Sequence, residues 1–354
     1  MKILVLDDGN IGNLVQSLGI AKNFPEKEIV ICSLKFKGPK YKLPKRKGNY
    51  PILPKFLNLF CFLKIYNIGF LFLKLFLKNN LSLIEYKYDV VINTGSLLSS
   101  VNLIISKVKK SKSIQIMLPS FIPLKEFNFL ITPYHDYIRV KYKNLKNLII
   151  TIGAPNLIDE KLLKEESEKL SRVIGNKNRE IIGLLIGGDD QNYKIDKEWI
   201  DKILIEIEEL KDRFNFLITV SKRTNYQITR YLEKSIHRIK EIKYFEVPYK
   251  TSISYYKGIL GLSDIIFVSE DSINMISEAL TTNKNVFIIG VKRRKNKKLI
   301  FDFTIEEIEK KGYGLFIPYK NICQLHKKIY EFKKKETYLN EAKRCVQEIL
   351  ARLN

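Results

Sequence analysis

The chain has 354 residues, which exceeds what a single hydrophobic core usually serves, so we expect two domains. Hydrophobic residues make up 45% of it, which is enough for sizeable cores and excludes a chain that is disordered over most of its length. Its formal net charge of +24 favours anionic partners such as nucleic acid, anionic lipid or phosphorylated small molecules, although a lysine-biased proteome explains the charge equally well.

Short apolar runs alternate with helical patterns through the first half of the chain. The apolar runs predict strands at 2–8, 28–34, 89–95, 113–119, 129–133 and 147–151, and the helical patterns lie at 10–23 and around 104–108. Alternation of this kind is typical of an α/β fold, with a parallel sheet and helices on both of its faces.

The segment 52–78, "ILPKFLNLFCFLKIYNIGFLFLKLFLK", is apolar and aromatic but contains lysines at 55, 64, 74 and 78. No uncharged run in it approaches the roughly 20 residues that a spanning helix needs. Two interpretations remain open. The segment forms an interfacial amphipathic surface that faces an anionic membrane, or it forms two core helices whose lysines extend outward to water.

A polar, lysine-rich helical stretch at 159–180 interrupts the alternation, which then restarts. Strands are predicted at 181–188, 214–221, 243–249, 264–270, 285–291 and 314–318, with helices at 196–213, 224–237, 253–262 and 304–311 and along the stretch 269–280. An amphipathic tail at 321–352 ends the chain. We therefore expect two βα domains, at 1–158 and 159–330, followed by a C-terminal helix at 331–354.

Cellular location is indicated by the cysteines and by the N-terminus. The cysteines at 32, 61, 323 and 345 are too far apart for a CxxC metal or redox motif. The N-terminal "MKILVLDDGN" has the pattern of a strand followed by acids rather than of a signal peptide. Both observations favour the cytoplasm, and an interfacial 52–78 segment places the protein peripherally on the inner membrane face. Nucleic acid is not an expected partner, because no zinc-finger spacing or aromatic RNA-binding signature accompanies the charge.

Polar residues directly after predicted strands are candidate ligand contacts, because ligands of parallel α/β sheets bind beyond the carboxyl ends of the strands. In "LIGGDDQNY", Gly187, Gly188 and Asp189 follow such a strand. Glycines allow the backbone to approach a phosphate, and the following helix offers free N–H donors. A simple tight turn explains the two glycines equally well.

The stretch "TVSKRTNY" places four polar residues at the end of the next strand, namely Ser221, Lys222, Arg223 and Thr224. The lysine–arginine pair can neutralise a diphosphate, and the arginine can do so in a bidentate manner. For Thr224 an ordinary helix N-cap is a strong alternative.

The stretch "SEDSINMISEAL", residues 269–280, joins a strand to a helix. Asp271 and Ser272 lie at the start of this helix, where a hydroxyl and backbone amides can meet a phosphate. Glu278 follows Ser272 by six residues, about 1.7 turns, on a helix with apolar neighbours such as Met275. A carboxylate there can accept hydrogen bonds from two ribose hydroxyls, so the stretch predicts a nucleotide diphosphate site. The alternative is a capped helix with Glu278 in water.

Two further motifs in the first half carry polar residues after strands. In "DDGNIGNLVQ" the candidates for a polar acceptor or a phosphate are Gly9, Asn10, Gly12, Asn13 and Gln16, with a tight turn as the equal alternative. In "TPYHD", His135 and Asp136 are a candidate base and its orienting acid, although a structural histidine is about as plausible. There is no GxSxG, no HExxH and no metal-ligand cluster, so we expect neither a hydrolytic serine nor a metal or other cofactor.

Taken in order, "DDGNIGNLVQSLGIA", "PYHD", "IGAPN", "LIGGD", "SKRT" and "EDSINMISEA" resemble the motifs of the mitochondrial fission ELM family over almost the whole chain. The last motif is the most specific. Departures are Lys222, where arginine is commoner, the acidic "DDQ" after the glycines, and the lysine-rich segments 35–50 and 291–298.

That family is similar to GT-B glycosyltransferases, which implies two Rossmann-like domains facing a cleft, with the C-terminal helix crossing back to the first domain. The resemblance implies that the second domain holds a nucleotide-sugar donor, with Ser272 at the diphosphate and Glu278 at the ribose, and that the first holds the acceptor. We expect a metal-independent glycosyltransferase in which Arg223 stabilises the leaving diphosphate and His135 or Asp136 is the base. The acceptor is expected to be lipid-linked or part of the cell envelope. Alternatives are a non-enzymatic membrane-associated factor on a degenerate transferase scaffold, or a nucleotide-sugar epimerase.

Overall fold

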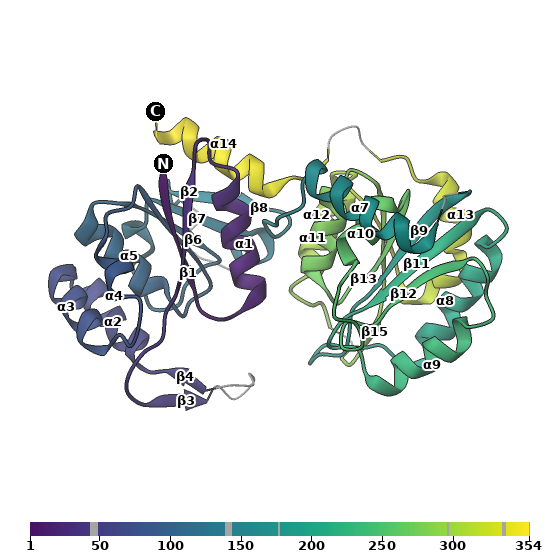
Figure 1. The fold of residues 1–354 in the computed structure, drawn as a ribbon, viewed down its shortest axis with the longest axis horizontal. Helices are drawn as coiled ribbons and strands as arrows, with labels where there is room; N and C mark the ends of the chain where they lie inside the picture. The colour runs from purple at the N-terminus through teal and green to yellow at the C-terminus, as the bar shows by residue number, and fades with distance from the viewer. Residues whose placement is uncertain (43–48, 139–143, 176–177, 296, 335–337, 354) are drawn as a thin grey trace. The chain divides into compact units, whose positions relative to one another are not determined.

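The computed structural model describes residues 1–42, 49–138, 144–175, 178–295, 297–334 and 338–353 (Figure 1). The chain folds as two compact α/β units. One unit comprises Met1–Leu157 together with Glu341–Asn354, and the other comprises Ile158–Asn340. The predicted α/β class is therefore confirmed, with one parallel six-stranded sheet in each unit.

The first unit is built on a parallel sheet with the strand order β2-β1-β5-β6-β7-β8. Its strands are β1 (Lys2–Asp7), β2 (Glu28–Ser33), β5 (Val90–Thr94), β6 (Lys112–Ile116), β7 (Phe129–Pro133) and β8 (Leu148–Thr151). Central strands are apolar on both sides because helices cover both faces, and β5 and β7 are buried throughout. All six lie within the runs that predicted them, or within one residue of those runs.

Two groups of helices cover the faces of this sheet. One face packs against α1 (Ile11–Lys22) and α14 (Glu341–Leu353). The other packs against α2 (Leu53–Phe62), α3 (Tyr66–Phe76), α4 (Leu81–Glu85) and α5 (Ser99–Lys109). Each face thus has a separate apolar core. The sheet is flanked by the short elements β3 (Lys40–Lys42), β4 (Asn49–Pro51), η1 (Leu124–Glu126) and α6 (Tyr134–Tyr137).

The C-terminal helix α14 belongs to the first unit. This agrees with the expectation that the C-terminal helix crosses back to the first domain. Cys345 and Ile349, one helical turn apart, are fully buried against the same core as Ile3 of β1. The carboxylate of Glu341 accepts a hydrogen bond from the Ile152 amide at 2.6 Å, just after β8. The amphipathic tail at 321–352 is thus divided between the two units.

The second unit has a parallel sheet with the strand order β12-β11-β9-β13-β14-β16. Its strands are β9 (Glu180–Ile186), β11 (Phe214–Val220), β12 (Ile242–Glu246), β13 (Ile265–Ser269), β14 (Asn285–Ile289) and β16 (Leu315–Ile317). A small antiparallel pair, β10 (Tyr193–Lys194) and β15 (Lys292–Arg293), was not predicted, because two-residue strands leave no apolar run in the sequence.

Helices of the second unit also divide into two groups. The core on one face includes residues of α8 (Lys197–Leu210), α9 (Tyr226–Ile236) and α13 (Leu325–Glu331), which follows the short η2 (Tyr319–Gln324). The remaining helices are α7 (Glu160–Ile174), α10 (Tyr256–Leu262), α11 (Ile273–Thr281) and α12 (Asp302–Lys310). A Cβ on Gly258 of α10 would lie 2.7 Å from the Glu166 carbonyl of α7, so these two helices pack closely. The polar stretch predicted at 159–180 therefore provides helix α7 of this unit, at Glu160–Ile174.

The segment 52–78 forms the two short helices α2 and α3, docked on α5. Leu57, Cys61 and Leu73 on these helices are fully buried, as the core-helix interpretation requires. Their outer side, however, is mostly apolar too, with Phe62 71% exposed. Among the described residues, no helix combines the length and the apolar character needed to cross a membrane.

Candidate functional site

The glycine turn after β9 is closed by Asp271 from the loop between β13 and α11. The Gly188 amide donates to Asp271 Oδ2 at 2.8 Å, and the Gly187 amide donates to Ser269 Oγ at 2.7 Å. Ser269 Oγ in turn donates to Asp271 Oδ1 at 2.6 Å. A Cβ on Gly187 would lie 2.1 Å from Asp271 Oδ2, so glycine is required at this position by an internal contact.

Arg223, at the end of β11, brings a positive charge to the same carboxylate. Its Nη2 donates to Asp271 Oδ2 at 2.9 Å. The Asp271 side chain is fully buried, whereas that of Arg223 is 44% exposed. Burial raises the pKa of Asp271, and the hydrogen bonds from Ser269 and Gly188 and the charge of Arg223 oppose that shift. The pair thus presents a guanidinium to solvent while its carboxylate stays inside.

Thr224 and Ser221 complete this network from the β11–α9 loop. The Thr224 hydroxyl donates to the Gly187 carbonyl, and Ser221 Oγ lies 3.3 Å from Thr224 Oγ1. The alternative that Thr224 caps α9 is wrong, because Asn225 is the N-cap and accepts from the Gln227 amide at 2.8 Å. Thr224 therefore holds the glycine turn rather than the start of α9.

Lys222 and Asp189 lie beside the network but take no part in it. Lys222 is exposed, and no hydrogen bond or ion pair to another described residue involves its ammonium group. Asp189 Oδ1 accepts from the Ile195 amide at 2.9 Å, and Oδ2 pairs with Arg294 at 3.1 Å. Asp189 therefore fixes the loop that contains β15.

Helix α11 carries the remaining predicted residues of this unit. Ser272 is its N-cap residue, yet its hydroxyl makes no capping hydrogen bond. Met275 is half-buried in the first turn of α11. Glu278 is half-buried and accepts a hydrogen bond from Tyr256 Oη at 2.7 Å, so the alternative of a fully solvated carboxylate is wrong. Burial raises the pKa of Glu278, and the Tyr256 hydrogen bond partly opposes this.

Two groups at this edge of the sheet were not singled out from the sequence. Tyr256, the partner of Glu278, belongs to α10 and precedes it by 22 residues. Glu270 is buried, accepts from the Val291 amide at 2.8 Å and pairs with Arg293 at 3.0 Å, and Arg293 also binds Asp302. The only sequence signal for the second group was an acid directly after one strand and an arginine after the next.

In the first unit, the "DDGNIGN" turn is held together by its own side chains. Asp7 accepts from the Gly9 amide at 2.8 Å, and Asp8 accepts from the Asn10 amide at 3.0 Å. Asn10 is the N-cap of α1 and accepts from the Asn13 amide at 3.2 Å, and Asn13 Nδ2 donates to Asp8 at 2.8 Å. Gly9 has φ +82°, which glycine adopts without strain. These contacts form a well-defined βα turn.

The other acceptor-side candidates, Gly12 and Gln16, lie on α1. Gly12 is half-buried in the first turn, and Gln16 is buried. Next to Gln16, the hydroxyls of Ser17 and Thr94 are 2.8 Å apart, which joins α1 to the end of β5. Gln16 itself is 8% exposed, so only a small part of this residue is open to solvent.

His135 and Asp136 lie on the short helix α6 rather than on a loop. The His135 ring is buried, and its Nε2 lies 4.0 Å from Asp136 Oδ1. That separation exceeds hydrogen-bond length. Asp136 therefore does not orient the imidazole through a hydrogen bond in this structure, in contrast to the expected pairing of a base with its orienting acid.

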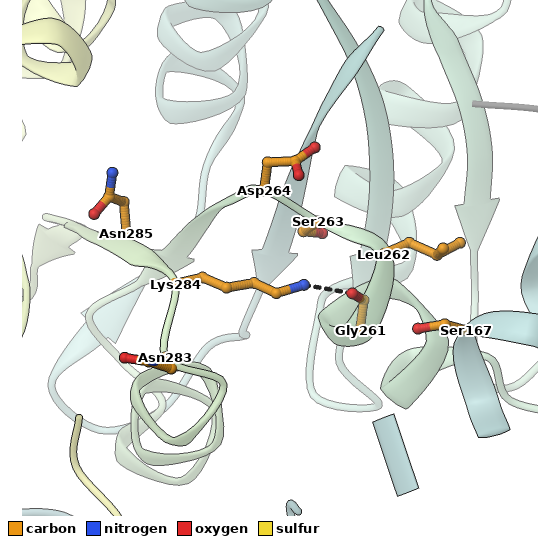
Figure 2. A pocket seen from close by; sticks show the side chains of 8 residues that line it. All are labelled: Ser167, Gly261, Leu262, Ser263, Asp264, Asn283, Lys284 and Asn285. Carbon is orange, nitrogen blue, oxygen red and sulfur yellow. Dashed lines mark hydrogen bonds between the residues drawn. The ribbon is translucent and has the colours of Figure 1, made fainter. Parts of the chain in front are cut away.

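A surface pocket of about 470 Å³ lies elsewhere in the second unit, at the amino ends of β13 and β14 (Figure 2). Its lining includes Asp264 and Asn285, and Figure 2 shows the Lys284 ammonium bonded to the Gly261 carbonyl at the end of α10. None of the predicted site residues lines this pocket. Across the described part of the chain, no group of three or more His, Cys, Asp or Glu side chains is placed to hold a metal ion.

Comparison with known sequences gives two matches. A family profile described as "Mitochondrial fission ELM1" matches residues 12–353. "Mitochondrial fission protein ELM1" of Arabidopsis thaliana is 23% identical over 206 residues, which are 52% of this chain and 47% of the plant protein. The chain thus matches about half the length of this relative.

Solved structures with similar folds include epimerases and glycosyltransferases. They include a putative UDP-N-acetylglucosamine 2-epimerase of Listeria monocytogenes (TM-score 0.55, 10% identity, 99% of this chain and 95% of the other). Another is the UDP-GlcNAc 2-epimerase of Neisseria meningitidis bound to UDP-GlcNAc (TM-score 0.51, 13% identity, 99% and 100%). A third is the ADP-heptose LPS heptosyltransferase II of E. coli (TM-score 0.51, 10% identity, 100% of both chains). Identities this low establish the fold alone. The chain has the GT-B-like fold of these enzymes and, by the match over almost its whole length, belongs to the mitochondrial fission ELM1 family.

Proposed function

We propose that this protein is a metal-independent glycosyltransferase whose second unit binds a nucleotide-sugar donor at the carboxyl ends of β9, β11 and β13. The observation that carries the proposal is the half-exposed Arg223 guanidinium, fixed by a buried carboxylate beside the start of α11. A guanidinium fixed in this way costs little reorganisation when negative charge develops on a leaving diphosphate. Exposed Lys222 supplies a second cation on the same loop.

Helix α11 supplies the other half of the proposed donor site. The Ser272 hydroxyl makes no capping hydrogen bond, and the first amides of the helix lack intrahelical partners, so both can donate to a phosphate. Glu278, further along the same helix, has one hydrogen bond from Tyr256 and retains lone pairs for ribose hydroxyls. The similar epimerase of Neisseria meningitidis was solved with UDP-GlcNAc bound, which supports this ligand class.

The proposed reaction breaks the bond between the anomeric carbon and the diphosphate oxygen and forms a bond from that carbon to an acceptor oxygen. The diphosphate departs with the electron pair, and its charge is stabilised by Arg223 and Lys222. The acceptor hydroxyl loses its proton to a base, for which His135 and Asp136 remain our candidates. We propose a lipid-linked or cell-envelope acceptor at the inner membrane face, with the Gly9–Asn13 turn and Gln16 as acceptor-side residues.

A nucleotide-sugar epimerase is the second candidate, because the similar structures include two enzymes named as UDP-GlcNAc 2-epimerases, one of them putative. It would use the same donor site without a second substrate. Anion-exchange chromatography separates free nucleotide diphosphate, the product of transfer or hydrolysis, from an epimerised nucleotide-sugar. A non-enzymatic factor would give neither product.

The test of the donor site is isothermal titration with UDP, GDP, CMP and ADP. Glu278→Ala should weaken binding of the preferred nucleotide by about 2 kcal/mol, in the range for hydrogen bonds to a charged group. The matched control is Glu306→Ala, which removes an exposed carboxylate of the same unit that pairs with Lys298. Equal nucleotide affinities for all three proteins, or binding of no nucleotide by the wild type, would reject the proposed site.

A further inference from the structure

Helices α2 and α3 each have two apolar faces, one toward the core and one toward solvent. On α2, Leu53, Leu57 and Cys61 recur every four residues and are buried. The solvent side carries a second apolar stripe, continued into the α2–α3 turn, that consists of Phe56, Leu59, Phe62 and Leu63. An amphipathic helix that serves only its own core places polar residues on the solvent side. The second stripe therefore has no explanation inside the first unit.

Helix α3 repeats this arrangement. Leu73 and Gly69 face inward, and a Cβ on Gly69 would lie 3.0 Å from Ile104 Cδ1 of α5, so α3 is packed closely on the unit. The outward residues of α3 and of the turn before it are Ile65, Ile68, Leu71 and Leu75, all of them exposed. We call the eight outward residues of the two helices and their turn the α2–α3 apolar face. It is a fixed part of the folded unit, because its helices have their own buried contacts.

The charges that the segment 52–78 itself contributes around the α2–α3 apolar face are of one sign. Segment 52–78 contains four lysines and no acidic residue. Lys64 pairs with Glu126 at 2.7 Å and Lys74 pairs with Glu85 at 2.5 Å, and both glutamates belong to other elements. Lys55 and Lys78, near the two ends of the segment, are exposed. Large apolar side chains bordered by lysines are the composition of helices that lie in the interface of an anionic bilayer.

We propose that the α2–α3 apolar face docks the protein on an anionic phospholipid bilayer, with its Phe, Leu and Ile side chains inserted among the acyl chains and its lysines at the headgroups. A second copy of this chain is a poorer occupant, because a net charge of +24 on each copy opposes self-association at low salt. The bilayer accounts for both the apolar stripes and the charge. This inference concerns binding alone and does not depend on the proposed transferase activity.

The experiment is co-sedimentation of the full chain with sucrose-loaded vesicles of phosphatidylcholine, either pure or with about 30% phosphatidylglycerol. Wild type should bind the anionic vesicles at least about tenfold more tightly than the pure phosphatidylcholine vesicles. Its binding to the anionic vesicles should fall as NaCl rises from about 50 to about 500 mM. The first test variant is Phe62→Ser/Leu71→Ser, with Ile253→Ser/Val173→Ser as its control, because these two exposed residues lie in the other unit.

The second pair of variants changes charge equally in two places. Lys55→Glu/Lys78→Glu alters the lysines of the docking segment, and Lys161→Glu/Lys310→Glu alters two highly exposed lysines of the second unit. Binding should drop at least about tenfold for Phe62→Ser/Leu71→Ser and for Lys55→Glu/Lys78→Glu, and should remain close to wild type for Ile253→Ser/Val173→Ser. For Lys161→Glu/Lys310→Glu the loss should be clearly smaller. Circular dichroism and thermal melting establish that each variant is folded.

Two outcomes would overturn the proposal. One is equal vesicle binding by Phe62→Ser/Leu71→Ser and its control, which would place any membrane contact elsewhere. The other is a wild type that binds no vesicles but forms dimers that Phe62→Ser/Leu71→Ser abolishes, as measured by analytical ultracentrifugation. In that case a second copy of the chain covers the α2–α3 apolar face.

Discussion

Where β11, β13 and β14 of the second sheet end, ion pairs tie the loops together, whereas where β5 and β6 of the first sheet end, amides and hydroxyls do so. In the second unit, Arg223 pairs with Asp271, and Arg293 pairs with both Glu270 and Asp302. Each arginine remains partly exposed while the Asp271 and Glu270 carboxylates are buried.

At the ends of β5 and β6 the contacts come from neutral groups. Asn102 Nδ2 donates to Asn93 Oδ1 at 2.7 Å and to the Ile114 carbonyl at 2.9 Å, and Ser106 donates to Asn102 Oδ1 at 3.0 Å. Gln115 Nε2 donates to three backbone carbonyls, among them that of Gly95. A neutral network holds loops in place but offers no fixed charge. The ends of β11 and β14 thus carry fixed, partly exposed cations with which to bind an anion, and the described residues at the ends of β5 and β6 do not.

The largest expected effect comes from the glycine turns of the two units. Gly187→Ala would place a Cβ 2.1 Å from Asp271 Oδ2 and should destabilise the protein by about 3 kcal/mol or more. Gly9→Ala meets no atom within 4 Å and should cost about 1 kcal/mol, from its positive φ alone. Urea unfolding of both variants measures the difference. Equal losses would show that Asp271 moves aside readily and that the charged edge is not rigid.

The next largest effect is expected when one member of the neutral network in the first unit is removed. Asn102→Ala leaves the buried Asn93 Oδ1 without its donor and should destabilise the protein by about 2–3 kcal/mol. This loss should be the same at low and high salt, because no charge is involved. A loss that changes with NaCl would contradict the neutral character of this network.

Arg223→Ala should cost somewhat less stability, about 1–2 kcal/mol, because the arginine is half-exposed although its partner is buried. Adding Asp271→Asn removes the unpaired buried carboxylate and should restore most of that loss. If Arg223 acts on the departing diphosphate, turnover should stay low in the double variant, with a larger effect on kcat than on KM. Recovery of turnover together with stability would make Arg223 a structural residue only.

The same catalytic assay tests the metal-independent part of the proposal. Because fixed cations are proposed to stabilise the leaving group, EDTA should leave turnover nearly unchanged. His135→Ala should lower transfer and leave nucleotide affinity unchanged. Activity that EDTA abolishes and magnesium or manganese restores would contradict the proposed role of Arg223 and Lys222.

The smallest effect concerns the pH dependence of stability at Glu278. Burial raises the pKa of this carboxyl in the folded protein above its unfolded value of about 4.3. A raised pKa means that the native state binds the proton more tightly, so wild type loses stability as pH rises through the folded pKa. Glu278→Gln cannot lose a proton, and its stability relative to wild type should therefore increase from pH about 4 toward neutrality. Urea unfolding across this range measures the difference, and a difference that narrows with pH would contradict the sign.

Sequence alone determined the strands of the two six-stranded sheets and most of the helices, because each depends on a local pattern. A run such as Val90–Thr94 is apolar on both sides and predicts a central strand wherever it lies in the fold. The residues after the strands were candidates for the same reason, since a parallel sheet brings its carboxyl ends to one edge. The sequence thus identified three candidate residues, Gly187, Arg223 and Asp271, which the structure brings together.

Tertiary structure decided which side chains meet and which remain in water. Arg223 and Asp271 are 48 residues apart, and Tyr256 reaches Glu278 from another helix, so no local spacing encodes either contact. Burial of only one side of α2 and α3 depends on where α5 lies, and sequence periodicity cannot distinguish an apolar stripe that faces a core from one that faces solvent. The return of α14 to the first sheet depends in the same way on a surface built by residues more than 300 positions earlier, such as Ile3.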